Sequence, residues 1–380
     1  MTATPNPSAG FSFLVRNTAG RQGTFDTAFH ILEQAISART FPGCALAVTL
    51  RGELVAHHAV GRFTYDPAAP PVMPDSIFDL ASVSKVVATT TMAMILYERG
   101  LLDLEAPVVA IVPEFATADP RRADVTVHML LAHSSGLPAY EKLFLRARTR
   151  DELLAAAFTT DLSADPGTRA EYSDIGFIIL GVALERLADE PLDTFCQREI
   201  FGPLGMAHTT FNPPRSWKDR IIPTADDQTF RHRIIQGEVQ DENAWVLNGV
   251  AGHAGLFSNV PDLLRFANEI LRALRPASDA DRGGPCLFEA ATIERFAERQ
   301  GPEGSSRALG WDTPSENSSA GRHFSPRSIG HLGYSGCSLW IDLEAGVAIV
   351  LLTNRTWPDR KSELIRQVRP AFHDALREAL

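Results

Sequence analysis

The stretch FDLASVSKVVATT (Phe78–Thr90) places a serine, Ser82, three residues before a lysine, Lys85. Lysine is rare in this chain, because only four of the 36 basic residues are lysines. The residues at the equivalent spacing before the other three lysines are Ala139 for Lys142, Arg215 for Lys218 and Pro358 for Lys361. The chain therefore contains a single Ser-x-x-Lys sequence. The presence of lysine rather than arginine at position 85 has to be explained by its chemistry.

That reason lies in the spacing and in the proton chemistry of lysine. Residues i and i+3 lie on one face of a helix, so a serine at a helix start can touch a lysine one turn later. A serine hydroxyl is a poor nucleophile until a neighbouring group takes its proton. Arginine stays charged, whereas lysine can lose its proton when it is buried. The pair also arises by chance in many chains, so other segments have to support it.

Composition limits the classes of protein that have to be considered. The chain has 380 residues, of which 44% are hydrophobic and 22% charged, and it is long enough for two lobes. A net charge of -10 argues against a nucleic-acid partner, which needs a basic surface. No run approaches the roughly 18 apolar residues of a membrane span, so we expect no membrane partner. The sequence does not indicate an oligomeric state.

The N-terminal segment and the cysteines bear on the cellular compartment. Residues 1–23 have no basic start and no long apolar run, so we expect a disordered or extended arm rather than a secretory signal. The four cysteines are widely scattered and form no metal-like pair. We therefore expect free buried thiols and a cytoplasmic protein, or a periplasmic one if the N-terminus has lost a signal.

Hydrophobic periodicity predicts strands at both ends of the chain and helices between them. The predicted hairpins are Cys44–Leu50 with Leu54–Gly61, and His331–Leu343 with Val347–Asn354. The predicted helices are Thr24–Arg39, Val83–Glu98, Ser173–Asp189, Pro261–Arg275, Phe288–Gln300 and 360–380. Residues 277–285 and 314–328 are predicted loops. Because an isolated hairpin is marginal in water, we expect both hairpins to share one antiparallel sheet, with a cleft between this sheet and the helical part.

Two distant segments can complete a site around Ser82. EYSDIGF places Tyr172 just before a capped helix. Such a tyrosine is either a half-buried aromatic or a phenolate, held near a cation, that takes the serine proton. In GHLGYSG, the glycines allow an extended backbone to approach a ligand closely. His331 in this segment is also compatible with a structural role.

Together these segments resemble the superfamily of serine β-lactamases and penicillin-binding proteins, in its class C-like branch. That branch also holds family VIII carboxylesterases and D-amino-acid-specific peptidases. Besides the three motifs, the resemblance rests on FPGCALAV, VTVHMLLAHSSGLP, PLGMAHTTF, DENAWVLNGVAGHAGLFSNVPDLLRF and LLTNR, and it covers about residues 25 to 375. The resemblance implies an α+β fold of the β-lactamase/DD-peptidase type. In that fold an antiparallel sheet from N- and C-terminal strands is flanked by the terminal helices and carries an inserted helical lobe.

The implied domain is single and spans residues 24–380. Its α/β lobe covers about 24–80 and 305–380, and its helical lobe covers about 81–304.

The resemblance also implies a role for each motif residue. Ser82 is the nucleophile that becomes acylated, Lys85 shares or steers its proton, and Tyr172 is the general base. The backbone N–H groups of Ser82 and Tyr334 form the oxyanion hole. The substrate-binding residues are expected to be Asp174 near Lys85, His331, Gly333 and His253. His253 in its Gly-rich turn is also compatible with a structural role. No metal and no organic cofactor are implied.

Two departures from the family pattern bear on the substrate. The second motif usually reads Tyr-x-Asn, and here it ends in Asp174, whose charge is expected to keep Lys85 protonated. The third motif reads Lys-Thr-Gly in β-lactamases, and here it is His331-Leu332-Gly333. A mostly neutral histidine and a leucine are poorly suited to a β-lactam carboxylate, although an arginine from a loop can compensate.

The sequence therefore favours a serine hydrolase that forms an acyl-enzyme on Ser82 and cleaves ester or amide bonds of small acyl compounds. The alternatives are a β-lactamase, a D-alanyl-D-alanine carboxypeptidase, a penicillin-binding sensor that acylates without turnover, and an inactive scaffold. The expected partner is a small-molecule ester, amide or β-lactam.

Overall fold

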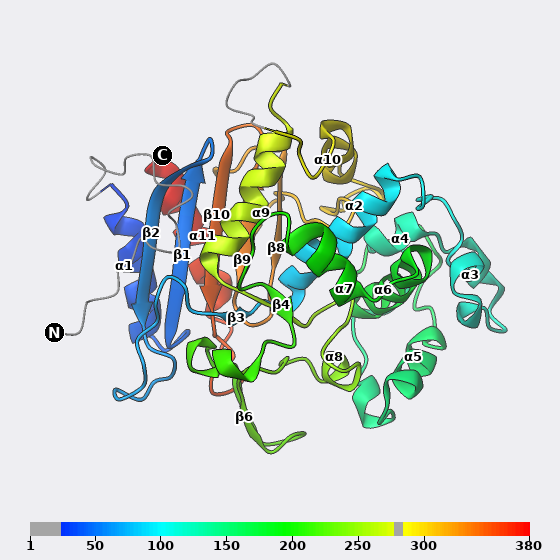
Figure 1. Ribbon diagram of the computed structural model, residues 1–380, viewed down its shortest axis with the longest axis horizontal. Coiled ribbons are helices and arrows are strands. Elements are labelled where there is room, and N and C mark those ends of the chain that lie inside the picture. The colour runs from blue at the N-terminus through cyan, green and yellow to red at the C-terminus, as the bar shows by residue number, and fades with distance from the viewer. Residues whose placement is uncertain (1–23, 277–283) are drawn as a thin grey trace.

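A five-stranded antiparallel sheet forms the centre of the protein. The computed structural model describes residues 24–276 and 284–380, and its strands follow the order β2-β1-β10-β9-β8 across this sheet (Figure 1). These strands are β1 (Gly43–Leu50), β2 (Glu53–Gly61), β8 (Ser328–Leu332), β9 (Ser338–Asp342) and β10 (Val347–Thr353). The two ends of the chain meet where β1 pairs with β10, which confirms the predicted α+β fold with one shared sheet.

The central strands are apolar on both faces. In β1 only Leu50 is not fully buried, and every residue of β10 is buried. Alternate residues of β1 belong to different hydrophobic clusters: Leu46 and Val48 pack on one side, and Ala45 and Ala47 on the other. Such near-continuous apolar runs are typical of strands that are covered on both faces.

Helices provide that cover. α1 and α11 pack against each other on one face of the sheet, and α9 lies on the other face beside β1 and β10 (Figure 1). The remaining helices lie on the α9 side and beyond the β8 edge. The helices are α1 (Asp26–Ser37), α2 (Thr91–Glu98), α3 (Val108–Ile111), α4 (Val127–Leu131), α5 (Arg150–Phe158), α6 (Asp174–Ala188), α7 (Leu192–Cys196), α8 (Glu242–Val246), α9 (Val260–Ala273), α10 (Ala290–Ala297) and α11 (Ile365–Glu378).

Segment 331–343 is two strands rather than the single strand that we predicted. β8 ends at Leu332, and β9 begins at Ser338. The residues between them form a tight loop, in which the Gly333 N–H donates to the Cys337 carbonyl at 2.7 Å and Gly336 has a φ of 107°. Glycine adopts that φ without a steric penalty, so the glycines mark a turn rather than an extended strand.

The predicted helices are present, with corrected ends. α6 starts as predicted after Ser173, whose side chain accepts from the Gly176 N–H. We predicted that the first helix begins at Thr24 with this threonine as its cap, but α1 begins after Phe25, which makes no side-chain cap. α11 begins only at Ile365, and α10 is shorter than predicted at both ends.

The predicted helix 83–98 is not uniform. Residues Lys85–Thr90 form a π-helix that continues into α2. A π-helical turn is rare and is frequently found at functional sites.

Two small sheets connect the central sheet to the helices. One contains β3 (Phe78–Asp79), β7 (Leu256–Ser258) and β4 (Thr210–Phe211), and the other is the hairpin β5 (Ala225–Asp227) with β6 (Arg233–Ile235). The pairing of β3 with β7 fixes the chain directly before Ser82.

Some predictions fall on residues that are not described. The N-terminal arm, 1–23, and residues 277–283 of the first predicted loop lie outside the described residues, and the division into two lobes stays a prediction. Residues 314–327 contain turns without helix or strand, as predicted. Within residues 24–276 and 284–380, no helix is long and apolar enough to cross a bilayer. In the same residues, no three His, Cys, Asp or Glu side chains are grouped to hold a metal ion.

Candidate active site

Ser82 lies in a short 3-10 turn, Ala81–Val83, directly after β3. Ala81 has a φ of 47°, in the left-handed region, where a residue with a Cβ is strained by roughly 1–3 kcal/mol. The Asp79 Oδ1 atom accepts a hydrogen bond from the Ala81 N–H at 2.8 Å and so holds this conformation. We call residues 79–85 the nucleophile turn.

Lys85 is fully buried one turn after Ser82, and its ammonium donates three hydrogen bonds. The acceptors are Ser82 Oγ at 3.0 Å, Asp174 Oδ1 at 2.6 Å and the His253 carbonyl at 2.9 Å. Burial disfavours the charged form of Lys85, but the nearby Asp174 carboxylate and Tyr172 hydroxyl outweigh this effect and raise the pKa of Lys85. Lys85 is therefore an ammonium group at neutral pH, and its proton donors are already engaged.

Tyr172 faces the same ammonium from the start of α6. The Lys85 Nζ atom lies 4.9 Å from the centre of the Tyr172 ring. Burial raises the pKa of the Tyr172 hydroxyl, and contacts of this hydroxyl with the Lys85 and Ser82 side chains oppose the rise without cancelling it. The structure thus brings Ser82, Lys85 and Tyr172 together from two distant segments.

Three basic side chains surround the Tyr172 ring. The His133 ring centre lies 4.7 Å from that of Tyr172, the His331 ring centre 5.9 Å, and the Arg307 Cζ atom 5.2 Å. Burial, followed by the positive charges of Arg307 and Lys85, holds the pKa of both histidines well below its usual range, so both imidazoles are neutral. We call Tyr172, His133, His331 and Arg307 the tyrosine wall.

The two histidines of the tyrosine wall have opposite tautomers. His133 Nδ1 accepts from the Ser173 N–H at 3.0 Å, so the proton of this neutral ring is on Nε2. His331 Nδ1 lies 2.9 Å from the Leu332 carbonyl and must donate to it, which leaves Nε2 as an acceptor. Both Nε2 atoms are buried and have no hydrogen-bond partner among the described residues.

The β8–β9 loop brings the Tyr334 backbone close to the nucleophile turn. A Cβ on Gly333 would lie 2.4 Å from the Leu80 carbonyl, so only glycine permits this approach. The Ser335 hydroxyl donates to the Asp79 carbonyl at 2.8 Å, and Arg369 donates to the Gly333 and Cys337 carbonyls. The Tyr334 side chain is 51% exposed beneath the Arg355 guanidinium.

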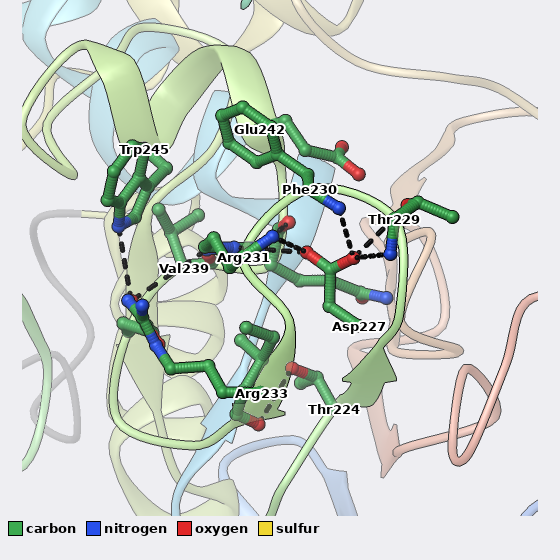
Figure 2. Close-up of polar contacts among 12 residues, drawn as sticks. Thr224, Asp227, Thr229, Phe230, Arg231, Arg233, Val239, Glu242 and Trp245 are labelled. Atoms are coloured by element: carbon green, nitrogen blue, oxygen red, sulfur yellow. Dashed lines mark hydrogen bonds and ion pairs between the residues drawn. The ribbon is translucent and has the colours of Figure 1, made fainter.

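A buried network supports the nucleophile turn from the β5–β6 side. Figure 2 shows the Asp227 carboxylate accepting from the N–H groups of Thr229, Phe230 and Arg231. Arg231 donates in turn to the Val239 and Gln240 carbonyls, each at 2.6 Å. The Gln240 N–H then donates to Asp79 Oδ2 at 2.7 Å, so the network reaches the residue that holds Ala81.

His253 reaches the site through its backbone. Its carbonyl accepts from Lys85, while its imidazole is buried and lies 2.9 Å from the Asp241 carboxylate. That imidazole contact keeps the pKa of Asp241 low, at about 2, despite the burial of this carboxyl. Asp174, which we also predicted to bind substrate, has one carboxylate oxygen on Lys85.

Asp79 and Arg307 were missed in the sequence. Asp79 lies inside FDLASVSK, but its partner Gln240 is far away in the chain, and nothing in the sequence links them. Arg307 lies in a segment without helix or strand whose tertiary position only the fold defines. The sequence indicated only that the third motif lacks a cation and that an arginine from a loop can supply one; it did not indicate which arginine.

The sheet topology and the cluster of half-buried Ser82 and Tyr172 around buried Lys85 define a hydrolase of the β-lactamase/DD-peptidase fold. The Beta-lactamase family model matches residues 29–371, and the chain belongs to this family.

Two curated relatives are similar across most of their length. An "N-acetylmuramyl-L-alanine amidase" from Bacillus subtilis is 30% identical over 360 residues, which cover 86% of this chain and 79% of the relative. A "Putative D-alanyl-D-alanine carboxypeptidase" from Salmonella agona is 30% identical over 310 residues, 74% of this chain and 70% of the relative.

Among solved structures, "EstCE1, a hydrolase with promiscuous acyltransferase activity" superimposes with a TM-score of 0.74 and 22% identity. The match covers 93% of this chain and 99% of EstCE1, and at this identity it supports the fold alone.

Proposed function

We propose that this β-lactamase-family hydrolase cleaves ester or amide bonds of small acyl compounds through an acyl-enzyme on Ser82. The observation that carries the proposal is the Lys85 ammonium, which donates to the Ser82 hydroxyl and the Asp174 carboxylate while it faces the Tyr172 ring. Because the pKa of Lys85 is raised, lysine cannot accept the serine proton at neutral pH. Tyr172 is the base in its phenolate form, which the Lys85 ammonium stabilises but which is a minor form at neutral pH, because burial raises the pKa of this hydroxyl.

In the proposed acylation step, the Ser82 proton moves first to Tyr172 and then to the leaving group. The Ser82 Oγ atom bonds to the acyl carbon while its proton passes to the Tyr172 oxygen. The backbone N–H groups of Ser82 and Tyr334 bind the developing oxyanion, an arrangement worth about 3–4 kcal/mol per donor in comparable sites. Tyr172 then delivers the proton to the leaving oxygen or nitrogen as its bond to the acyl carbon breaks. In deacylation, water loses a proton to Tyr172, attacks the acyl carbon and releases the acid, and Ser82 regains a proton.

The substrate is expected to be a small β-lactam, ester or peptide compound, because members of the family act on such compounds. Relatives named as an amidase and a carboxypeptidase support amide bonds, so a carboxypeptidase activity is the second candidate. The neutral His331 and the apolar Leu332 disfavour efficient β-lactam turnover. If the protein were instead a penicillin-binding sensor, a labelled penicillin would acylate it persistently without turnover. We also propose a cytoplasmic site of action, supported by the buried thiols of Cys44, Cys196 and Cys337.

The test is Ser82→Ala measured on p-nitrophenyl esters. We expect kcat/KM to fall by about 10⁴-fold or more, as in comparable nucleophile deletions. Ser37→Ala on the exposed end of α1 is the matched control and should retain activity. Mass spectrometry should show the acyl group on the peptide that contains Ser82, and ester hydrolysis that survives Ser82→Ala would rule out this nucleophile.

A further inference from the structure

A buried arginine lies behind the β8–β9 loop. Arg369 is on α11 and is only 6% exposed. Its Nη2 atom donates to the Gly333 carbonyl and to the Cys337 carbonyl, each at 2.8 Å. The Gly333 N–H also donates to the Cys337 carbonyl, at 2.7 Å. The guanidinium therefore holds the two ends of the loop at the point where they meet.

The Arg369 charge is buried without a carboxylate to offset the burial. Burial lowers the pKa of this guanidinium to about 10, Cys337 opposes this effect, and the Arg355 charge adds to it. Arg369 is still a cation at neutral pH, and its Nε atom has no hydrogen-bond partner among the described residues. A buried charge that meets only carbonyl oxygens is costly, whereas an apolar side chain would fill the same space without that cost. Packing alone therefore does not explain an arginine at position 369.

The Gly333 carbonyl belongs to the same peptide unit as the Tyr334 N–H, which is the proposed oxyanion donor. In a planar trans peptide the C=O and N–H groups point in opposite directions, so a donor that fixes the carbonyl also fixes the direction of the N–H. Hydrogen bonds in series strengthen one another by roughly 10–30% per bond, and a charged donor forms a stronger bond than a neutral one. Arg369 therefore orients the Tyr334 N–H and also increases its partial positive charge.

The second proposed oxyanion donor, the Ser82 N–H, has a similar arrangement behind it. The carbonyl of its peptide unit is that of Ala81, which accepts from the Ser84 hydroxyl at 2.6 Å. That hydroxyl is buried and accepts in turn from the Leu256 N–H at 3.1 Å. Both oxyanion peptides thus have a side-chain donor on their carbonyl, and this donor is neutral behind Ser82 but charged behind Tyr334.

Arg355 offers a comparison within the same loop. Its Nε atom donates to the Tyr334 carbonyl at 2.7 Å. This carbonyl belongs to the peptide unit that carries the Ser335 N–H, and not to the unit that carries the Tyr334 N–H. Arg355 and Arg369 therefore hold neighbouring peptide units, and of these two arginines Arg369 is the one behind the oxyanion donor.

We propose that Arg369 is a positioning residue of the oxyanion hole, which orients and polarises the Gly333–Tyr334 peptide unit from behind. The inference rests on the proposed function, in which the Ser82 and Tyr334 N–H groups bind the oxyanion. The acyl oxygen becomes negative in the transition state, and a polarised N–H binds that charge more strongly than it binds the neutral carbonyl of the substrate. Arg369 therefore lowers the barrier to acylation and has little effect on substrate binding.

The test measures the rate of acylation and the carbonyl stretch of the acyl-enzyme. Stopped-flow release of p-nitrophenolate from p-nitrophenyl cinnamate gives the acylation rate constant and the dissociation constant of the ester. We expect Arg369→Gln to lower the rate constant by about 10- to 100-fold, less than the roughly 10²- to 10³-fold loss caused by deleting an oxyanion donor, and to leave the dissociation constant nearly unchanged. In infrared spectra, the stretch of an isotope-labelled acyl carbonyl should move to higher wavenumber, because weaker hydrogen bonds polarise the carbonyl less.

Arg355→Gln is the matched control, because it removes a guanidinium from the next carbonyl of the same loop, and it should leave the carbonyl stretch unchanged. Arg369→Lys keeps the charge but loses the planar guanidinium, so we expect smaller changes in the same directions as for Arg369→Gln. Circular dichroism confirms that each variant is folded, and Arg369→Lys supplies the comparison if Arg369→Gln is not.

An unchanged rate constant and an unchanged stretch in the folded Arg369 variants would overturn the inference. An equal shift of the stretch in Arg355→Gln would also overturn it, because the loop as a whole would then have loosened. In both cases an acyl group on Ser82 would still uphold the proposed function. If the unsubstituted protein formed no acyl-enzyme on Ser82 from either p-nitrophenyl cinnamate or p-nitrophenyl acetate, the proposed function and the inference would both be overturned.

Discussion

The nucleophile turn and the tyrosine wall lie on two sides of one reaction centre, and they differ in how their polar groups are satisfied. In the nucleophile turn, Asp79 accepts two backbone N–H groups and Lys85 donates three hydrogen bonds. On the tyrosine wall, the Nε2 atoms of His133 and His331 have no hydrogen-bond partner among the described residues, and the Asp312 carboxylate lies 3.9 Å from the Arg307 guanidinium.

This difference shows what each side contributes. A buried polar group without a partner costs roughly 1–3 kcal/mol, so unsatisfied groups seldom gather without a function. The satisfied side holds Ser82 in one position before any substrate arrives. The unsatisfied side holds one buried N–H donor and one buried imidazole acceptor without partners among the described residues, next to the Arg307 cation. Three substitutions test whether the two sides differ in this way.

The largest effect is expected for Tyr172→Phe, which removes the proposed base from the tyrosine wall. Loss of a general base typically lowers the rate by about 10² to 10⁴-fold, and we expect kcat/KM for p-nitrophenyl esters to fall in that range. Tyr97→Phe on α2 makes the same chemical change at a ring that packs on Phe296, and it should have little effect. If Tyr172→Phe kept a third or more of the activity, the base would have to be sought elsewhere.

Asp174→Asn tests how the two sides are coupled. The Asp174 charge contributes to the raised pKa of Lys85 and to that of Tyr172. Because the phenolate is the active form, kcat/KM should rise with pH towards the pKa of Tyr172, above the usual tyrosine range. Removing the carboxylate lowers that pKa, so the rising limb of the pH–rate profile should move to lower pH. Asp66→Asn in an exposed turn is the control, and a limb that coincides with that of the unsubstituted protein would contradict the coupling.

The smallest effect on activity is expected for Asp79→Asn, whose main consequence is the pH dependence of stability. Burial raises the pKa of Asp79 to about 6, so the folded protein binds a proton that the unfolded chain releases nearer pH 4. Asp79 therefore stabilises the fold at acidic pH, and this contribution is lost as pH rises through about 6.

Urea unfolding of both proteins at pH 4 and pH 7 measures this contribution. The difference in unfolding free energy between the unsubstituted protein and Asp79→Asn should change by about 2 kcal/mol, in favour of the unsubstituted protein at pH 4. A difference that is the same at both pH values would show that Asp79 does not titrate in this range.

The sequence predicted helices and strands correctly where a residue pattern is compatible with a single local structure. The apolar runs of β1 and β10 and the Ser173 cap of α6 are examples. The β8–β9 loop was mispredicted because glycines suit both a strand that approaches a ligand and a turn with positive φ. The π-helix at Lys85–Thr90 could not be expected either, since apolar periodicity does not distinguish it from an α-helix.

The residue types of the reaction centre could be identified from the sequence. They are one Ser-x-x-Lys, one tyrosine before a capped helix, and a third motif without a cation. Spacing along a single helix was enough to join Ser82 to Lys85, because that contact is local. The family resemblance already placed Asp174 near Lys85. The contact of Asp79 with Gln240 and the position of Arg307 beside the Tyr172 ring became visible in the folded structure alone. These contacts join segments far apart in the chain, and sheet pairing and burial, rather than any local propensity, bring such groups together.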